Sequence, residues 1–225
     1  MTLEQRVFPS LFQKGAWAPL RLALRAHAKL DIRGLENLND IKRNVIFAPN
    51  HTSKFDPLLL VASLPFSSTH LPLIFGSREK SYYECKGWEH LVYGGTFFRL
   101  MGAHPMYGGL GDYEASLQHH LRFARNGRSI CVFPTRLAKE HISDEARGGV
   151  IYLSLSTQTP IVPVHIRDVA GLTLGSLVSR KHAISVTFGK PLYPEEIEGW
   201  NTLQGGNSRY TAIARELMRH IERLA

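Results

Sequence analysis

Cysteine is scarce in this chain of 225 residues, which holds Cys85, Cys131 and no others. Two cysteines are too few for a disulfide framework, and they show no metal-binding spacing, so we expect free or buried thiols in a reducing compartment. No apolar run approaches the roughly 18–20 residues that cross a bilayer. The N-terminus lacks the basic flank and long apolar core of a secretory signal. We therefore expect a protein of the cytoplasm or of the inner face of a membrane.

Several catalytic signatures are also missing. The 11 histidines form no HExxH helix and no cysteine–histidine quartet, so we predict no metal site. The chain has neither the G-x-S-x-G turn of serine hydrolases nor a Walker-type phosphate loop. Its aromatic residues lack the basic interleaving of a platform for single-stranded nucleic acid.

Acidic residues are outnumbered, with 19 Asp and Glu against 27 Lys and Arg, which gives a net charge of +8 and a pI near 9.7. Such an excess suits a polyanion, either nucleic acid or an anionic membrane surface. The apolar content of 44% is ordinary for a globular protein. The length allows one domain with a real core, or a domain with a small appendage.

The first 29 residues differ from the rest. They contain apolar residues at helical spacing, a proline that we expect to interrupt the helix, and three cations at i, i+4 and i+8. The apolar residues are Phe8, Leu11, Phe12, Leu20 and Leu24, the proline is Pro19, and the cations are Arg21, Arg25 and Lys29. Such a helix could lie in a membrane interface or pack on the domain with a solvated basic face. Because the charge favours the membrane, we predict a basic amphipathic membrane-interface segment over 1–29 and a folded domain over 30–225.

From residue 30 onward, strand-like and helix-like runs alternate. The expected strands are 30–33, 45–48, 73–75, 129–133, 161–166 and 183–188. The expected helices are 56–64, 79–88, 112–125, 149–158 and 211–224. This alternation predicts an α/β fold, a single domain with a mixed central sheet flanked by helices.

The segment 49–57, PNHTSKFDP, stands where a strand-like run gives way to a helix-like run. A histidine base needs a carboxylate to fix its tautomer and stabilise the imidazolium that forms, and His51 and Asp56 could be such a pair. Asp56-Pro57 is equally typical of a helix start, with aspartate as the N-cap. Taken alone, the pair leaves both interpretations open.

The ordered motifs of the chain resemble those of the glycerolipid acyltransferases, the superfamily of 1-acylglycerol-3-phosphate acyltransferase. Asn50-His51, four further residues and Asp56 are similar to the first motif, HX4D. The third motif resembles 130–136 (ICVFPTR), the fourth resembles 159–166 (TPIVPVHI), and a C-terminal strand ending resembles 188–192 (FGKPL). The histidine spacing is a weak signal, whereas this ordered set is a strong one.

Two motifs depart from the family pattern. The third normally reads FPEGTR, and here no acid or glycine stands between Pro134 and Thr135. The second normally ends in arginine, at a position that Gly108 occupies here. In the family both elements are associated with the glycerol phosphate of the acceptor, so the resemblance leaves the acceptor open.

The resemblance implies a glycerol-3-phosphate acyltransferase-like fold and an O-acyltransferase of phospholipid biosynthesis. The enzyme would move a fatty acyl group from acyl-CoA or acyl carrier protein to a hydroxyl of a lysophospholipid-like or other lipid acceptor, with no further cofactor. His51 would be the general base and Asp56 its orienting carboxylate. The implied substrate-binding residues are Asn50, Thr52, Ser53, Gly108, Gly109, Phe133, Pro134, Thr135 and Arg136.

For three of these groups, the chemistry of the residues gives a reason to expect a role in binding. The guanidinium of Arg136 could bind a phosphate bidentately. Backbone N–H groups of the turn at Gly108 and Gly109 could hold a phosphate, although a plain flexible turn explains the glycines as well. Backbone donors near Thr52 and Ser53 could stabilise an oxyanion.

Two alternatives remain open from the sequence. The incomplete second and third motifs would suit a lipid-binding or regulatory homologue that has lost transferase activity. A nucleic-acid-binding domain rests on charge alone. We expect no nucleic-acid partner, and a location in the cytoplasm, peripheral on the inner membrane face.

Overall fold

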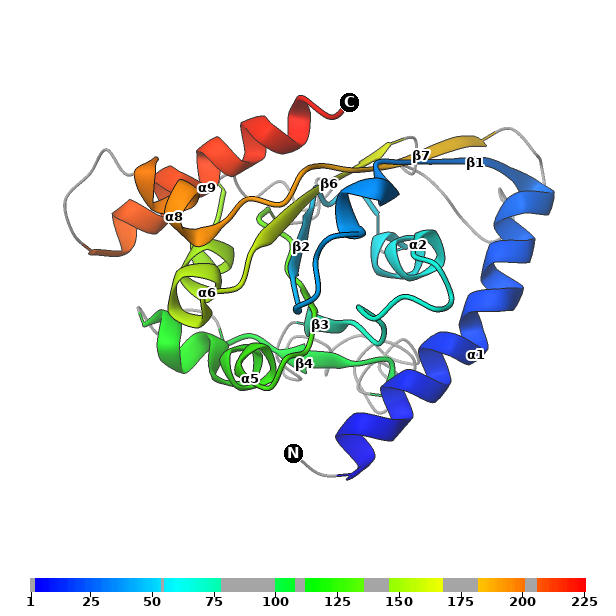
Figure 1. The fold of residues 1–225 in the computed structure, drawn as a ribbon, viewed down its shortest axis with the longest axis horizontal. Coiled ribbons are helices and arrows are strands. Elements are labelled where there is room, and N and C mark those ends of the chain that lie inside the picture. The colour runs from blue at the N-terminus through cyan, green and yellow to red at the C-terminus, as the bar shows by residue number, and fades with distance from the viewer. Residues whose placement is uncertain are drawn as a thin grey trace, which may run out of the picture.

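A computed structural model describes residues 3–53, 55–77, 100–107, 112–135, 146–167, 182–200 and 206–225. A seven-stranded sheet runs through its centre and carries helices on both faces (Figure 1). The predicted α/β fold with a mixed central sheet is therefore confirmed. The expected helix over 79–88 lies outside the described residues.

The other expected strands and helices are present, with shifts at their ends. The strands are β1 (Ala28–Arg33), β2 (Ile46–Pro49), β3 (Ile74–Ser77), β4 (Ala103–Pro105), β5 (Ile130–Cys131), β6 (Ile161–Arg167) and β7 (His182–Phe188). The helices are α1 (Leu3–His27), the 3-10 helix η1 (Leu35–Leu38), α2 (Asp56–Ser63), α5 (Tyr113–Arg125), α6 (Gly149–Thr157), α8 (Pro194–Gly199) and α9 (Gly206–Glu222). The short elements β4 and α8 were not expected. Strand β5 is shorter than predicted; beyond it Pro134 has no N–H to offer a strand partner.

The order of strands in the sheet is β1-β7-β6-β2-β5-β3-β4. Strands β2, β3, β4, β5 and β6 run parallel, whereas β7 pairs antiparallel with β6, and β1 runs parallel to β7. Because β2 lies between β6 and β5, the residues that follow β2 emerge between the carboxyl ends of two other strands.

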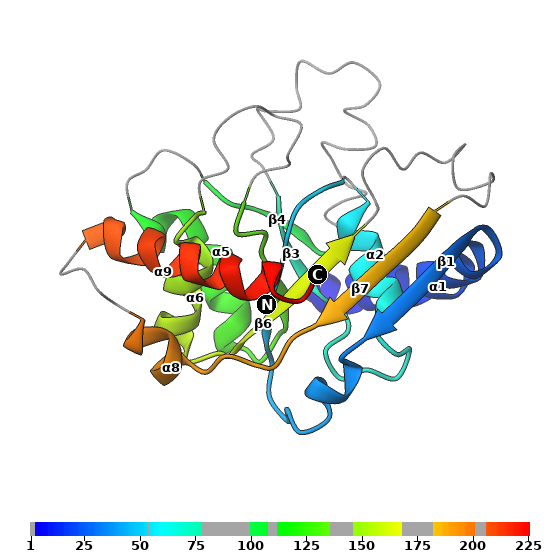
Figure 2. The same cartoon turned by 90° about the horizontal axis from the view of Figure 1, so that it is seen from above.

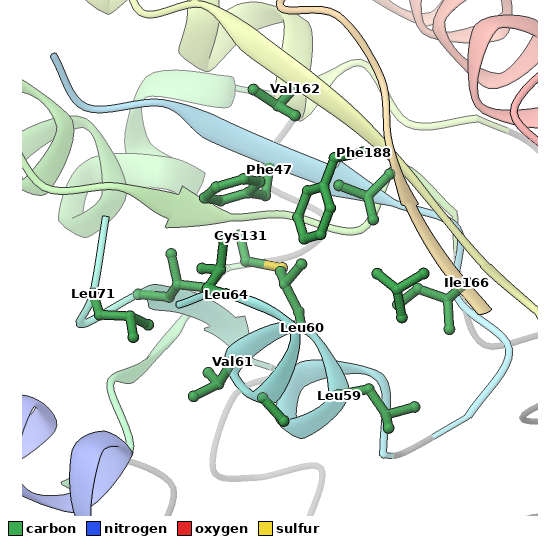
Figure 3. Close-up of a cluster of buried hydrophobic side chains, with 14 of the residues drawn as sticks. Phe47, Leu59, Leu60, Val61, Leu64, Leu71, Cys131, Val162, Ile166 and Phe188 are labelled. Atoms are coloured by element: carbon green, nitrogen blue, oxygen red, sulfur yellow. The ribbon is translucent and has the colours of Figure 1, made fainter. Parts of the chain in front are cut away.

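Two apolar cores cover the two faces of the sheet. Phe47 of β2 points to the face covered by α1 and α2, while its neighbours Ile46 and Ala48 point to the face covered by α5, α6 and α9, as the period of a strand requires. Figure 3 shows Leu60 of α2 close to Cys131 of β5, below the sheet. Burial of a leucine such as Leu60 contributes ~1.5–3 kcal/mol, so these faces determine where α2 sits.

Helix α1 is continuous through Pro19, contrary to the expected interruption. Its fully buried Gln13 anchors it to the domain: the amide nitrogen donates to the carbonyls of Leu73 and Met101, both at 2.7 Å, and the amide oxygen accepts from the Leu73 N–H at 2.8 Å. The indole of Trp17 donates to the Leu64 carbonyl at 2.8 Å. Beyond the proline, Leu24 is 1% exposed and belongs to the core, so tertiary contacts on both sides of Pro19 hold the helical path.

The expectation that three cations share one helical face is wrong. Lys29 belongs to β1, and the Arg21 guanidinium donates to the Ala62 carbonyl at 2.5 Å and lies over the ring of Trp17. Arg25 is exposed. None of the helices in the described ranges is both long and apolar enough to cross a membrane.

Candidate active site

The candidate site lies where the chain connections leave the sheet in opposite directions. Strand β2 leads to α2 on one face, and its neighbour β5 leads to α6 on the other (Figures 1 and 2). In open α/β sheets such a switch point leaves a crevice at the carboxyl ends of the strands. His51 follows β2 and Phe133 follows β5, so both stand at this point.

The predicted pair of His51 and Asp56 is formed. Their Nδ1 and Oδ2 atoms are 2.9 Å apart, the Asp56 carboxyl group is fully buried, and the His51 side chain is 20% exposed. A carboxylate only accepts hydrogen bonds, so Nδ1 carries the proton and Nε2 keeps the basic lone pair. The arrangement is that of a general base with an orienting carboxylate, reachable from solvent only at the histidine.

Asp56 does not cap α2 in the way its sequence suggested. It is the first residue of the helix, after the N-cap Phe55, and its Oδ1 has no hydrogen-bond partner among the described residues. Its Oδ2 instead accepts backwards from the N–H groups of Thr52 at 2.8 Å and Ser53 at 2.9 Å. The carboxylate therefore holds the loop that carries His51 against the first turn of α2.

These two bonds also change one expectation. The backbone N–H groups of Thr52 and Ser53 are engaged by Asp56, so they are not the free donors that an oxyanion needs. Their role in the described structure is to orient and stabilise the carboxylate. An oxyanion donor has to come from elsewhere.

Phe133 lies against the imidazole of His51, with ring centroids 4.1 Å apart and planes 26° apart. The sequence had placed Phe133 among the substrate-binding residues, through its motif, and gave no indication of this stacking. The contact exists because β2 and β5 are neighbours in the sheet. With Asp56 on one edge of the ring and Phe133 on its face, the imidazole has little rotational freedom.

Cys131 is fully buried in β5, two residues before Phe133. Burial raises the pKa of its thiol well above the ordinary value, and the negative charge of Asp56 adds to this effect. The thiol stays protonated at physiological pH and is a poor nucleophile. The expectation of a buried free thiol is confirmed for Cys131, while Cys85 lies outside the described residues.

His120 is another histidine to consider as a base, and it does not qualify. It is fully buried in α5, and its Nε2 hydrogen-bonds the Phe75 carbonyl at 3.2 Å. Burial is the main cause that lowers its pKa to about 4. His120 is therefore a neutral core residue at physiological pH.

Asn50 is near the site, but both ends of its amide are engaged by the protein. Its Nδ2 donates to the Ile166 carbonyl at 2.8 Å, and its Oδ1 accepts from the Ile166 N–H at 2.7 Å. The sequence had grouped Asn50 with the substrate-binding residues. No signal in the sequence could have identified Ile166 as its partner, which lies 116 residues away.

The remaining predicted residues are only partly described. Pro134 is buried, and its carbonyl accepts from the Arg147 N–H at 2.7 Å, which ties the segment after β5 to the start of α6. Thr135 follows it, half-buried. Gly108, Gly109 and Arg136 lie outside the described residues. Across the described ranges, no group of three or more histidine, cysteine or acidic side chains is arranged to hold a metal ion.

Comparisons with known proteins concern the fold and the family of the chain. The structure is similar to the crystal structure of the 1-acyl-sn-glycerophosphate (LPA) acyltransferase PlsC from Thermotoga maritima, with a TM-score of 0.59 at 15% identity, over 95% of this chain and 78% of that one. At this identity the likeness concerns the fold. No curated protein matches the sequence.

The family comparison covers the part of the chain that carries the site. A model of the Acyltransferase family matches residues 29–167, from the first strand to the end of β6. This range contains the segments that resemble the first, third and fourth motifs, with His51, Asp56, Phe133 and Pro134 among their residues. The resemblance found in the motifs is thereby confirmed, and the chain belongs to the Acyltransferase family.

Proposed function

We propose that this protein transfers a fatty acyl group from a thioester, acyl-CoA or acyl carrier protein, to a hydroxyl of a lysophospholipid-like or other lipid acceptor. The observation that carries the proposal is the 2.9 Å contact between His51 Nδ1 and Asp56 Oδ2. It supplies an oriented base at the carboxyl end of a central strand, where α/β proteins bind their ligands.

In the proposed step, His51 Nε2 takes the proton of the acceptor hydroxyl while the oxygen attacks the thioester carbonyl. The tetrahedral intermediate collapses, the carbon–sulfur bond breaks, and the imidazolium returns the proton to the leaving thiolate. Asp56 stabilises the imidazolium between these two transfers. The products are an acyl ester and a free thiol, and the proposed step uses no metal, cofactor or covalent enzyme intermediate.

The chemical class of the acceptor needs a separate argument. The Thermotoga maritima protein is described as an LPA acyltransferase. The family motifs linked to glycerol phosphate are altered here, since Gly108 occupies the usual arginine position and Thr135 follows Pro134 directly. We propose that Arg136 contacts an anionic headgroup and that the acceptor class is wider than lysophosphatidate.

The experiment is an acyl-transfer assay with the purified full chain. Labelled acyl-CoA and labelled acyl carrier protein are each offered with lysophosphatidate, with lysophospholipids of other headgroups and with a neutral monoacylglycerol. We expect a labelled ester with at least one acceptor. Lysolipid binding without product from any pair would instead favour the inactive lipid-binding homologue, which the altered motifs make the second candidate.

We further propose that the protein works peripherally at an anionic membrane surface, on the cytoplasmic face where such lipids are available. Five of the seven exposed large hydrophobic side chains among the described residues lie on α1. We call these the exposed apolar stripe: Val7, Phe8, Leu11, Phe12 and Leu22. A sixth, Phe66, packs edge-on against Trp17, at 5.5 Å between centroids, and lies under the ammonium of Lys14.

From Val7 to the end of α1 the charged residues are all cations. Between Val7 and His27 the sequence contains Lys14, Arg21 and Arg25 and no acidic residue. An apolar helix face bordered by cations fits the boundary between acyl chains and anionic headgroups. The opposite face of α1 is already buried on the domain through Gln13 and Leu24, so the stripe is available without unfolding.

The stripe can be tested with serine at its two most exposed residues, Leu11 (62% exposed) and Leu22 (70% exposed). Each leucine contributes ~1.5–3 kcal/mol when it leaves water, so the double variant should bind anionic vesicles at least ~100-fold more weakly in a sedimentation assay. Tyr193→Ser, which removes an exposed aromatic outside α1, should bind like wild type. Unchanged binding of the double variant would refute the role of the stripe.

A further inference from the structure

Asn50 occupies the position at which β2 leaves the sheet. The ladder between β2 and β6 pairs Ile46 with Ile161 and continues to Pro49 and Val164. Its last backbone bond runs from the Asn50 N–H to the Val164 carbonyl, at 3.3 Å. The main chain then turns away into the loop of His51, while β6 continues to Arg167.

This divergence would leave the backbone of Ile166 without its ladder partners on the β2 side. Ile166 is 1% exposed, and on its other side it is paired with Val186 of β7. An unpaired buried backbone group destabilises the folded state, because its hydrogen bonds to water are lost without replacement. The Asn50 amide meets both groups, since Oδ1 accepts from the Ile166 N–H and Nδ2 donates to the Ile166 carbonyl. The side-chain amide of Asn50 thus replaces the next pair of backbone hydrogen bonds between β2 and β6.

The amide also has a defined orientation. The Ile166 N–H requires an oxygen opposite it, and the Ile166 carbonyl requires an N–H, so the amide cannot flip without losing both bonds. The residue that follows is His51, whose Nδ1 is bound by Asp56 and whose ring face lies against Phe133. The histidine loop is thus attached to β6, to α2 and to the end of β5.

We propose that Asn50 is a positioning residue, which sets the place of His51 relative to Asp56 and Phe133 by hydrogen-bonding the backbone of β6, and that it does not contact the substrate. This inference rests on the proposed role of His51 as a general base. It revises the substrate-binding role that the motif implied for Asn50. Loss of the amide should let the loop shift while both substrates still bind.

The chain offers a matched control at the other end of the same strand. The Asn44 amide nitrogen also makes two part-buried bonds to backbone carbonyls, those of Ala124 at 3.0 Å and Arg128 at 3.2 Å. Asn44 precedes β2, whereas Asn50 follows it. Asn44→Ala and Asn50→Ala should therefore lower the melting temperature to a similar extent, and only the second should affect His51.

Two readouts on the full chain decide the matter. The first is the hydrogen-bonded Nδ1 proton of His51, followed by NMR in ¹⁵N-histidine-labelled protein. It should be shifted or broadened in Asn50→Ala and unchanged in Asn44→Ala. An unchanged signal in Asn50→Ala overturns the proposal, whether or not the wild type transfers acyl groups.

The second readout is the kinetics of acyl transfer. Because a misplacement of about 1 Å can cost ~100-fold, kcat of Asn50→Ala should fall by ~10–100-fold while the KM values of donor and acceptor change less than about threefold. A raised acceptor KM with unchanged kcat overturns the proposal in favour of a substrate contact. If Asn50→Ala does not fold, Asn50→Asp keeps the acceptor for the Ile166 N–H, and both readouts should move in the same direction. Wild-type inactivity would sink the proposed function, leaving the NMR test of Asn50 valid.

Discussion

His51→Ala is expected to lower the rate of acyl transfer by about 10²–10⁴-fold while the protein stays folded. That factor is the usual contribution of a positioned general base. The imidazole is 20% exposed and its loss leaves the sheet intact, so circular dichroism and the melting temperature should change little. The measurement is kcat with the best donor and acceptor from the panel.

A second histidine provides the control. His119→Ala removes a half-exposed imidazole from α5, remote in sequence from the first motif, and should leave kcat unchanged. Wild-type kcat in His51→Ala would contradict the general-base mechanism. A rise in KM alone would assign His51 to substrate binding instead.

Asp56→Asn should produce a loss of comparable size for a different reason. His51 Nδ1 and the N–H groups of Thr52 and Ser53 all bond one oxygen of this side chain, Oδ2, so an amide oxygen in that place can accept all three bonds. The amide is neutral, however, and no longer stabilises the imidazolium that forms when Nε2 takes the proton of the acceptor.

The Nδ1 proton distinguishes loss of charge from disruption of the pair. In ¹⁵N NMR, His51 should be protonated at Nδ1 both in the wild type and in Asp56→Asn. Full activity in Asp56→Asn, or low activity together with loss of the Nδ1 proton, would show that the charge of the carboxylate does not act through the histidine.

The buried environment of the pair was only partly predictable. The separation of His51 and Asp56 by one loop before a helix indicated that they could meet, and they do. That Asp56 would bind backwards to Thr52 and Ser53 was not predictable, because the residue type is equally suited to capping. The backbone path of the loop decides between these two uses of one carboxylate.

Helix α1 illustrates the same limit. Its apolar content predicted a helix with one apolar face. In the structure, the side with Gln13 and Leu24 is buried against the domain, and the other side exposes Leu11 and Leu22. Periodicity describes which residues share a face. It does not say which face meets the protein, because that depends on how Gln13 and Trp17 bond to chain segments far away.

Local periodicity predicted the α/β class and the positions of most strands and helices, and the spacing of His51 and Asp56 within one loop indicated that the two could meet. The stacking of Phe133 on His51 and the bonds between Asn50 and Ile166 arise only in the folded chain. Both contacts follow from the order of strands, in which β2 lies between β5 and β6. That order reflects the packing of two cores on a shared sheet, a property of the whole chain that no single segment encodes.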